Sequence, residues 1–177
     1  MIDDHPKIRE IIAKARRANP SANFETGDIF PSQQAPILIG HQNKIFARFA
    51  RWGFHQKIIN ARSESVEIKP VFSADFMSHR ALVPITAFYE WDKAKQMYLF
   101  NDPKNPVLYL AAIYNSQQEF TIITAPAKAP VKGIHHRMPV IILPKHFHDW
   151  LFDNTKAKAL LKNNELVQLT SHQQEKK

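Results

Sequence analysis

The sequence predicts an α+β fold in a single domain, with a mainly antiparallel, barrel-like β-sheet core and flanking helices at both ends. Three observations predict it. Helical periodicity is confined to the two ends of the chain, and the stretch between residues 36 and 143 alternates short apolar runs with polar turns. A length of 177 residues suits one domain, spanning 1–177, with a sizeable buried core.

The N-terminal element is predicted to be a helix over residues 6–18. Lysines and arginines occupy much of this segment, but apolar side chains recur on one face, at Ile8, Ile11, Ile12 and Ala15. Residues 19–34 contain two prolines and a glycine and are predicted to be mostly loop. Residues 37–39 and 44–47 then flank a polar turn, which predicts a β-hairpin.

The remaining elements are predicted from short apolar runs and their flanking turns. Further strands are predicted at residues 48–54, 82–91, 97–100, 107–114, 120–124 and 137–143. A helix is predicted to start at 63–66, where Ser63 offers an N-cap, and two short helices are predicted at 148–152 and 156–161. Residues 170–177 are expected to form a disordered tail.

Composition indicates a basic, cysteine-free protein. Lysine and arginine outnumber aspartate and glutamate by 24 to 16, which gives a formal net charge of +8. Because neutralising phosphates releases counterions, nucleic acid is the predicted partner, with simple solubility as the alternative reading of the charge. The absence of cysteine excludes disulfides and thiol nucleophiles within these residues. With neither a signal peptide nor an apolar run that could cross a bilayer, we expect a cytoplasmic, nucleoid-associated monomer without membrane contact.

The segment 58–64 holds the first candidate site residues. Asn60 and Arg62 stand two residues apart after an apolar pair, so an extended chain points both to one face. An amide that donates and accepts, beside a guanidinium fork, suits a sugar and a phosphate. The alternative is a strand end with an asparagine turn and a surface arginine.

Glu90 is the second candidate. The aromatic side chains of Phe88, Tyr89 and Trp91 frame it. A poorly solvated position raises the pKa of a carboxyl group, which favours a general acid. Trp91 also suits stacking on an exposed base. The alternative is a glutamate at the rim, paired with a nearby lysine, above aromatics that belong to the core.

A third candidate segment contains His135, His136 and Arg137, just after Gly133. Adjacent residues of a strand point to opposite faces, so at most one of the two histidines is expected to enter a site. A histidine shuttles protons near neutral pH, and Arg137 suits a phosphate. The alternative is one solvent-exposed histidine and one buried, hydrogen-bonded histidine.

Trp52 lies in a fourth segment, the aromatic and basic cluster at 50–54, which suits stacking and phosphate contact; simple packing is the alternative. Nine histidines raise the question of a metal site. His146 and His148 diverge on a helix, however, and a metal needs a third convergent ligand, so we expect neither metal nor cofactor. The four glycines never cluster, so the sequence shows no phosphate-loop or dinucleotide signature.

Five segments follow one another in a recognisable order along the chain. They are residues 50–53, residues 60–64, residues 82–84 with 88–91, residues 124–127, and residues 134–139. Together they resemble the abasic-site-processing family known as SOS response-associated peptidases, and residues 27–36 resemble that family's segment before its first hairpin. The resemblance implies a β-barrel-like core and a positively charged groove for single-stranded DNA that contains abasic sites.

The resemblance also implies a mechanism. In the family, the initiator methionine is removed and a cysteine becomes residue one. Its α-amine attacks the ring-opened sugar aldehyde of the abasic site, and its thiol then closes a thiazolidine ring. By position, Asn60 matches the residue that orients the sugar, Glu90 the acid/base for ring opening, and His135 the residue that assists proton transfer. The DNA-binding positions implied in the same way are Trp52, Arg62, Trp91 and Arg137.

The start of the chain departs from the family pattern. The family begins Met-Cys-Gly-Arg, whereas this chain begins Met1-Ile2-Asp3, with the predicted helix close behind. We expect the short strand that carries the cysteine to be absent, through a start at an internal methionine, trimming or true loss. Residues 54–56 also replace the family's usual Leu-Ile-Pro, which alters one wall of the groove.

Three functions follow from these residues. The first is a DNA-repair protein of the SOS and DNA damage responses that recognises abasic sites in single-stranded DNA, with impaired crosslinking and self-processing (peptidase, hydrolase) chemistry. The second is a non-catalytic single-stranded-DNA-binding module that keeps only the groove. The third is a hydrolase that uses Glu90 and His135 on peptides.

Overall fold

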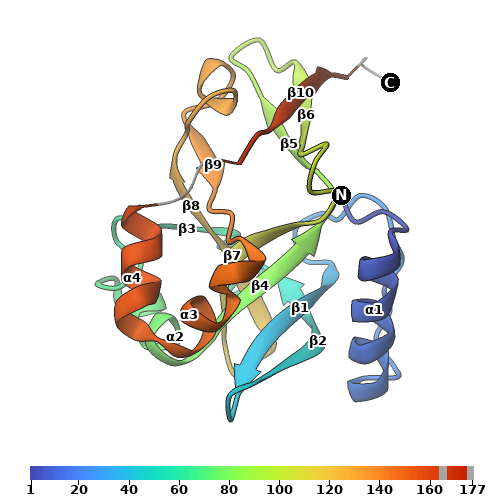
Figure 1. Ribbon diagram of the computed structural model, residues 1–177, viewed down its shortest axis with the longest axis vertical. Helices are drawn as coiled ribbons and strands as arrows, with labels where there is room; N and C mark the ends of the chain where they lie inside the picture. Colours follow the sequence, from blue (N-terminus) through green and yellow to red (C-terminus); the bar gives the residue numbers. More distant parts are fainter. Residues whose placement is uncertain (164–166, 175–177) are drawn as a thin grey trace.

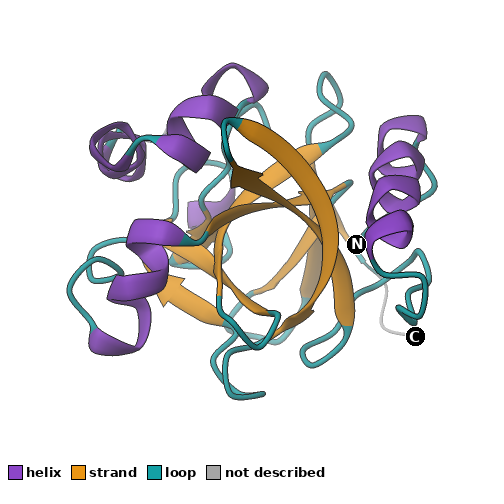
Figure 2. Ribbon diagram, turned by 90° about the horizontal axis from the view of Figure 1, so that it is seen from below, coloured by secondary structure: helices purple, strands orange, loops and turns teal. Residues whose placement is uncertain are grey.

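A ring of five strands forms the centre of the molecule in the computed structural model, which describes residues 1–163 and 167–174. The strands are β1 (Gln34–His41), β2 (Lys44–Trp52), β4 (Arg80–Ile85), β7 (Leu108–Tyr114) and β8 (Glu119–Pro126). They pair in the order β2-β1-β4-β7-β8, and β8 pairs back to β2, which closes the barrel seen end-on in Figure 2. The closure pairs are Arg51 with Glu119 and Trp52 with Phe120.

Two short strands extend the barrel sheet on either side of β8. β3 (Asn60–Arg62) pairs with β8 in parallel, and β9 (Arg137–Pro139) pairs with it antiparallel. Apart from the two parallel pairings of β8 with β2 and β3, the pairings of this sheet are antiparallel. The predicted α+β class with a barrel-like, mainly antiparallel core is therefore confirmed.

The hairpin of β1 and β2 also follows the prediction, with a tighter turn. His41 pairs with Lys44 across a two-residue turn. Gln42 and Asn43 both have positive φ, at 46° and 59°. This conformation matches the right-handed twist of the flanking strands, so it fixes the register of the pair.

A small second sheet projects from one end of the barrel (Figure 1). It contains β5 (Phe88–Trp91), β6 (Met97–Asn101) and β10 (Thr170–Gln173), in the order β10-β6-β5. The prediction of one strand over 82–91 is wrong, because its first half pairs with β7 in the barrel and its second half with β6.

The predicted disordered tail from residue 170 is wrong for the residues that form β10. Thr170 pairs with Asn101 and Gln173 with Tyr98, so the unpaired edge of β6 supplies backbone hydrogen-bond partners that the sequence pattern does not reveal. The last three positions of that predicted tail, 175–177, lie outside the described residues.

Helices surround the ring of strands (Figure 2). They are α1 (Pro6–Ala18), α2 (Pro70–Ser78), η1 (Val131–Gly133), η2 (Pro144–His146), α3 (Phe147–Phe152) and α4 (Asn154–Lys162). The helix predicted to start at Ser63 is wrong: the backbone N–H of Ser63 donates to the Thr124 carbonyl oxygen at 2.8 Å, and the helix starts later, at Pro70. Within the described ranges, none of these helices is long and apolar enough to cross a membrane.

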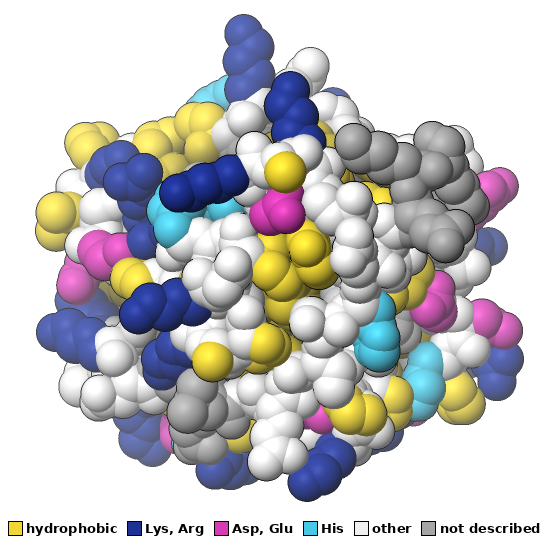
Figure 3. Space-filling model, turned by 90° about the horizontal axis from the view of Figure 1, so that it is seen from above, with side chains coloured by type: hydrophobic (Ala, Val, Ile, Leu, Met, Phe, Trp, Pro, Cys, Tyr) yellow, Lys and Arg dark blue, Asp and Glu magenta, His cyan; other side chains and the backbone are white. Residues whose placement is uncertain are grey.

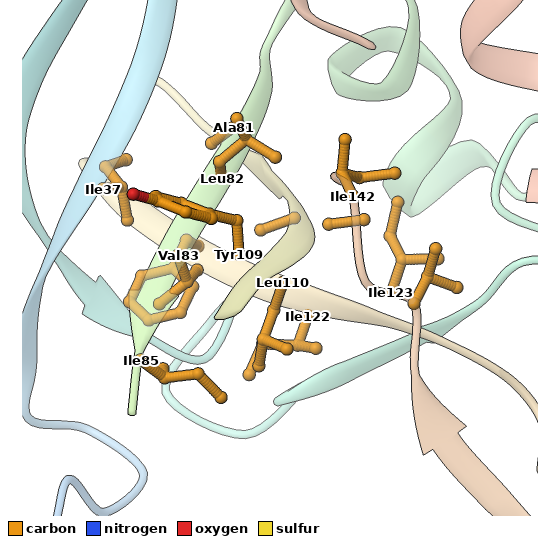
Figure 4. Close-up of a cluster of buried hydrophobic side chains, with 14 of the residues drawn as sticks. Ile37, Ala81, Leu82, Val83, Ile85, Tyr109, Leu110, Ile122, Ile123 and Ile142 are labelled. Atoms are coloured by element: carbon orange, nitrogen blue, oxygen red, sulfur yellow. The ribbon is translucent and has the colours of Figure 1, made fainter. Parts of the chain in front are cut away.

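The barrel interior holds the main hydrophobic core (Figure 4). Strands β4, β7 and β8 contribute the most continuous buried runs, because both of their faces are covered. Leu82 and Ile123 are fully buried there. Burial of such side chains contributes about 1.5–3 kcal/mol each. The barrel sheet thus supports β3 and β9, and the small sheet supports β5, the strands that carry polar residues of the candidate site.

Candidate functional site

Glu90 and His135 form the centre of the candidate site. The carboxylate oxygen Oε2 of Glu90 lies 3.1 Å from Nδ1 of His135. Glu90 is on β5 of the small sheet, and His135 precedes β9 of the barrel sheet, so the site lies where the two sheets meet. Both side chains are partly buried, with 18% of Glu90 and 33% of His135 exposed. The two residues predicted as acid/base and proton-transfer groups are therefore neighbours.

The environment of Glu90 makes it an acid that titrates near neutral pH. Burial raises the pKa of the Glu90 carboxyl to about 7, and the positive charge of protonated His135 only partly opposes this. Along β5 the burial falls from Phe88, which is buried, to Trp91, which is exposed, and Glu90 is intermediate. A carboxyl group that exchanges its proton near pH 7 is suited to general acid/base catalysis.

His135 is oriented by its own backbone as well as by Glu90. Its Nδ1 lies 3.0 Å from the carbonyl oxygen of Arg137 and 3.1 Å from the Glu90 carboxylate, two groups that accept hydrogen bonds. Both acceptors lie closer to Nδ1 than the backbone N–H of Arg137, which is 3.4 Å away, and they favour the tautomer with a proton on Nδ1. Nε2 has no hydrogen-bond partner among the described residues, so this nitrogen is the one available to a ligand.

The first two residues of the chain lie at the same junction. Ile2 forms an isolated antiparallel bridge with Gly27, and the Met1 α-amine donates to the carbonyl oxygen of Ala87 at 2.9 Å. Burial lowers the pKa of this α-amine, with the charge of Asp28 opposing the shift. Ile2 forms only this isolated bridge, and the first named strand, β1, follows α1. That the cysteine-bearing strand is absent therefore stays a prediction.

Tyr89 is a site residue to which the sequence pattern assigned no role of its own. Its hydroxyl donates to Asp28 Oδ1 at 3.0 Å and lies 3.6 Å from the sulfur of Met1. Burial and the neighbouring Asp28 raise the pKa of Tyr89 to about 12. The sequence placed Tyr89 among the aromatics around Glu90, but its pairing with a residue 61 positions away has no local signal.

Asn60 and Arg62 form a separate part of the candidate site. Both are exposed while Ala61 between them is fully buried, so they share one face, as the spacing predicted. Among the described residues, neither forms a hydrogen bond or an ion pair with Glu90 or His135. The strand pairings place Asn60 opposite Ile122 and Arg137 opposite Pro126 on β8, four residues apart. The backbones of Asn60 and Arg137 are therefore offset by about 13 Å along β8.

The two tryptophans implied as DNA surfaces differ in their exposure. Trp91 is 49% exposed beside Glu90 on β5. Trp52 is partly buried: its ring stacks on that of Phe120 at 6.4 Å, and its Nε1 donates to the carbonyl oxygen of Ile59 at 3.0 Å. Trp91 thus has an open face for a base, whereas Trp52 also holds the segment that leads into Asn60.

Arg137 is engaged within the protein. Its guanidinium forms a two-pronged ion pair with Glu64, in which Nη2 lies 2.9 Å from Oε2. Nη2 also donates to the Thr124 carbonyl oxygen at 2.6 Å. A phosphate that approaches Arg137 therefore meets a guanidinium whose orientation is already fixed.

The surface seen from this end of the molecule carries charges of both signs (Figure 3). The view shows lysine and arginine side chains at several places around the edge, acidic side chains both at the edge and near the middle, and hydrophobic side chains between them. His146 Nδ1 and Asp149 Oδ2 are 3.9 Å apart, but the described residues contain no cluster of three or more side chains that could hold a metal ion.

Comparison with known proteins places these residues in a family context. The SOS response associated peptidase (SRAP) family matches residues 3–176. The abasic site processing protein YoaM of Bacillus subtilis (strain 168) is 30% identical over 146 residues, 70% of this chain and 64% of that protein. YedK of Escherichia coli (strain K12), also named an abasic site processing protein, is 25% identical over 130 residues, 67% of this chain and 58% of YedK. The chain thus spans less than two thirds of the length of these relatives.

Solved structures show the same fold. A crystal structure of a protein from Bacteroides thetaiotaomicron superposes with a TM-score of 0.73 and 18% identity, covering 94% of this chain and 87% of that one. A phage-related protein from Bordetella bronchiseptica gives a TM-score of 0.71 at 20% identity, covering 92% of this chain and 89% of that one. At these identities the likeness concerns the fold.

Proposed function

The chain belongs to the SOS response associated peptidase family, and from that premise we propose that it recognises abasic sites in single-stranded DNA. The observation that carries the proposal is the Glu90–His135 pair, in which the carboxylate and the imidazole lie 3.1 Å apart. The next residue of β5, Trp91, is 49% exposed. An abasic site lacks a base, so its deoxyribose can approach side chains that an intact nucleotide would not reach. The basic net charge supports a polyanion as the partner.

The proposed chemistry is the opening of the sugar ring. An abasic deoxyribose is a cyclic hemiacetal: when it opens, the anomeric hydroxyl loses its proton, the bond between C1 and the ring oxygen breaks, and that oxygen gains a proton. Glu90, with a pKa of about 7, is suited to supply one proton, and Nε2 of His135 to accept the other. Glu90 loses one proton in this step and His135 gains one, so the total charge of the pair does not change.

The direct test is a comparison of three DNA ligands. We expect tighter binding to a single strand with one abasic site than to the same strand intact, and tighter binding to either than to the duplex. Affinity should also fall steeply with salt. The matched control is Glu67→Gln, which removes a carboxylate that is paired with Lys158 and is not part of the site. Equal affinity for all three ligands would contradict the proposal.

A second test asks whether the site still supports the family's covalent chemistry. Met1 is the natural position for a nucleophile, because its amine and sulfur lie at Ala87 and Tyr89. We expect Met1→Cys, expressed behind an additional initiator methionine that is removed, to form a denaturation-resistant adduct with abasic single-stranded DNA. Met1→Ser, which offers an amine without a thiol, is the control. No adduct from Met1→Cys would contradict the transfer of this mechanism to the chain.

The non-catalytic binding module is the second candidate. Two observations favour it: the 177 residues contain no cysteine, and among the described residues Asn60 forms no hydrogen bond with Glu90 or His135. It predicts that Asn60→Ala and His135→Ala leave DNA affinity unchanged. Loss of abasic-site preference in His135→Ala would favour the first candidate, whereas unchanged preference would favour the binding module.

A further inference from the structure

One backbone group and one side chain, from the strands on opposite sides of β8, donate hydrogen bonds to the same carbonyl oxygen. On one side, the backbone N–H of Ser63, which follows β3, donates to the Thr124 oxygen at 2.8 Å. On the other, Nη2 of Arg137, the first residue of β9, donates to the same oxygen at 2.6 Å. Thr124 therefore links the strand that carries Asn60 to the strand that follows His135.

Glu64 completes this link from the β3 side. Its two carboxylate oxygens accept hydrogen bonds from both Nη atoms of Arg137, and Oε2 also accepts one from the Ser63 hydroxyl at 3.1 Å. The hydrogen bonds from Arg137 lower the pKa of Glu64 to about 2, although burial opposes the shift, so the ion pair is present throughout the neutral range. Such fork-to-fork pairs restrict orientation as well as distance. Only 15% of the Arg137 side chain is exposed.

The backbone of Arg137 contacts the ring that carries the chemistry. Its carbonyl oxygen and its N–H lie 3.0 Å and 3.4 Å from Nδ1 of His135. Arg137 is thus fixed at its side chain by Glu64 and Thr124, and at its backbone it contacts the imidazole. Movement of the guanidinium would move the peptide groups that orient His135.

We propose that Glu64 is a positioning residue for His135: by holding the Arg137 guanidinium, it fixes the backbone that keeps the imidazole Nδ1 toward Glu90 and Nε2 toward the ligand. The alternative is an ordinary surface ion pair, since about half of the Glu64 side chain is exposed. Surface pairs contribute little to stability and leave distant rings unchanged. The two roles therefore differ in what happens to His135.

The experiment measures His135 without DNA. Ring ¹⁵N resonances distinguish a neutral imidazole protonated at Nδ1 from one protonated at Nε2. We expect wild type to show the Nδ1–H form for His135, and Glu64→Gln to shift these resonances toward a mixture of the two tautomers. Arg137→Lys, which replaces the fork by a single ammonium group, should have the same effect. Glu67→Gln, which removes the same charge three residues away, should leave His135 unchanged.

Unchanged His135 resonances in Glu64→Gln and Arg137→Lys would overturn the proposal. If Glu64→Gln does not fold, Arg137→Lys serves in its place, because it leaves Glu64 intact and removes the guanidinium fork. A folded Arg137→Lys protein with wild-type His135 resonances would overturn the proposal equally.

The consequence for DNA rests on the proposed function. We expect Glu64→Gln to reduce the preference for abasic over intact single strands by about tenfold, as misplaced reacting groups do, with little change in affinity for the intact strand. If wild type shows no such preference, the proposed function fails, while the resonances of His135 still decide the role of Glu64.

Discussion

Two partly or fully buried carboxyl groups, Glu119 in the barrel and Glu90 in the small sheet, differ in their charge state. Glu119 is 3% exposed, and burial alone would raise its pKa, yet hydrogen bonds from Asn115, His55 and Arg51 outweigh burial and hold the pKa below the ordinary value. Glu90 is more exposed, and within residues 1–163 and 167–174 its only ion-pair partner is His135, so burial raises its pKa to about 7. The number of hydrogen-bond donors, rather than the depth of burial, decides whether a carboxyl group is a structural anion or a reactive acid.

The largest expected effect comes from breaking the structural carboxylate. Glu119→Ala leaves Arg51, the His55 N–H and the Asn115 amide without their acceptor. We expect a loss of about 3 kcal/mol in the free energy of unfolding, as for other disrupted buried ion pairs. Urea unfolding at pH 7 measures it. A loss below about 1 kcal/mol would mean that water replaces Glu119 as the acceptor for these donors. Glu119 would then not be a structural anion, and the difference from Glu90 would not hold.

The two carboxyl groups should also give opposite dependences of stability on pH. Glu90 has a raised pKa, so between pH 4.5 and about 7 the folded state binds more protons than the unfolded state, and stability falls as pH rises. The shift from 4.5 to about 7 corresponds to at most about 3 kcal/mol at 1.36 kcal/mol per pH unit. Glu119 has a lowered pKa, so its contribution is present above the unfolded pKa and is lost as pH falls.

Glu90→Gln tests this directly. The variant has no carboxyl group to ionise, so its stability should no longer fall between about pH 5 and pH 8 by the amount that Glu90 contributes. The measurement is urea unfolding of wild type and variant across that range. Glu67→Gln is the control, since Lys158 lowers the pKa of Glu67. Parallel pH profiles for wild type and Glu90→Gln would show that Glu90 is an ordinary, solvated acid.

The sequence could predict features that depend on one segment, but not those that depend on contacts between distant segments. Alternating apolar runs predicted most barrel strands, because burial on the inside of a closed sheet leaves a pattern in each strand by itself. The proximity of Glu90 and His135, and the closed ends of the barrel, depend on pairings between distant segments. The Glu64–Arg137 pair joins residues 73 positions apart and the Tyr89–Asp28 pair 61. Strand β10 was missed because its side chains are largely exposed and the stabilising partner is the edge of β6.

A smaller effect is expected at the exposed ring beside Glu90. Trp91→Ala should change the free energy of unfolding by under about 1 kcal/mol, because the side chain is 49% exposed. The same change should weaken binding to single-stranded DNA by about 1–3 kcal/mol if a base stacks on the ring. Trp52→Ala should lower the free energy of unfolding more and the affinity for DNA less, since the Trp52 ring stacks on Phe120 and its Nε1 donates to the Ile59 carbonyl oxygen. Fluorescence anisotropy and urea unfolding on both variants measure the two effects.

The smallest effect distinguishes the two arginines implied as phosphate contacts. Arg62 is exposed and makes no ion pair among the described residues, whereas Arg137 is held by Glu64 and Thr124. If Arg62 contacts one phosphate, Arg62→Ala should lower the slope of log affinity against log salt by about 0.7, the value for single strands, without changing the preference for abasic DNA. Arg137→Ala should instead reduce that preference, because it releases the backbone that orients His135. Binding isotherms across a series of salt concentrations measure both quantities. An unchanged slope in Arg62→Ala would show that the β3 face does not touch the DNA backbone, and it would leave the junction of the two sheets as the DNA contact that these residues support.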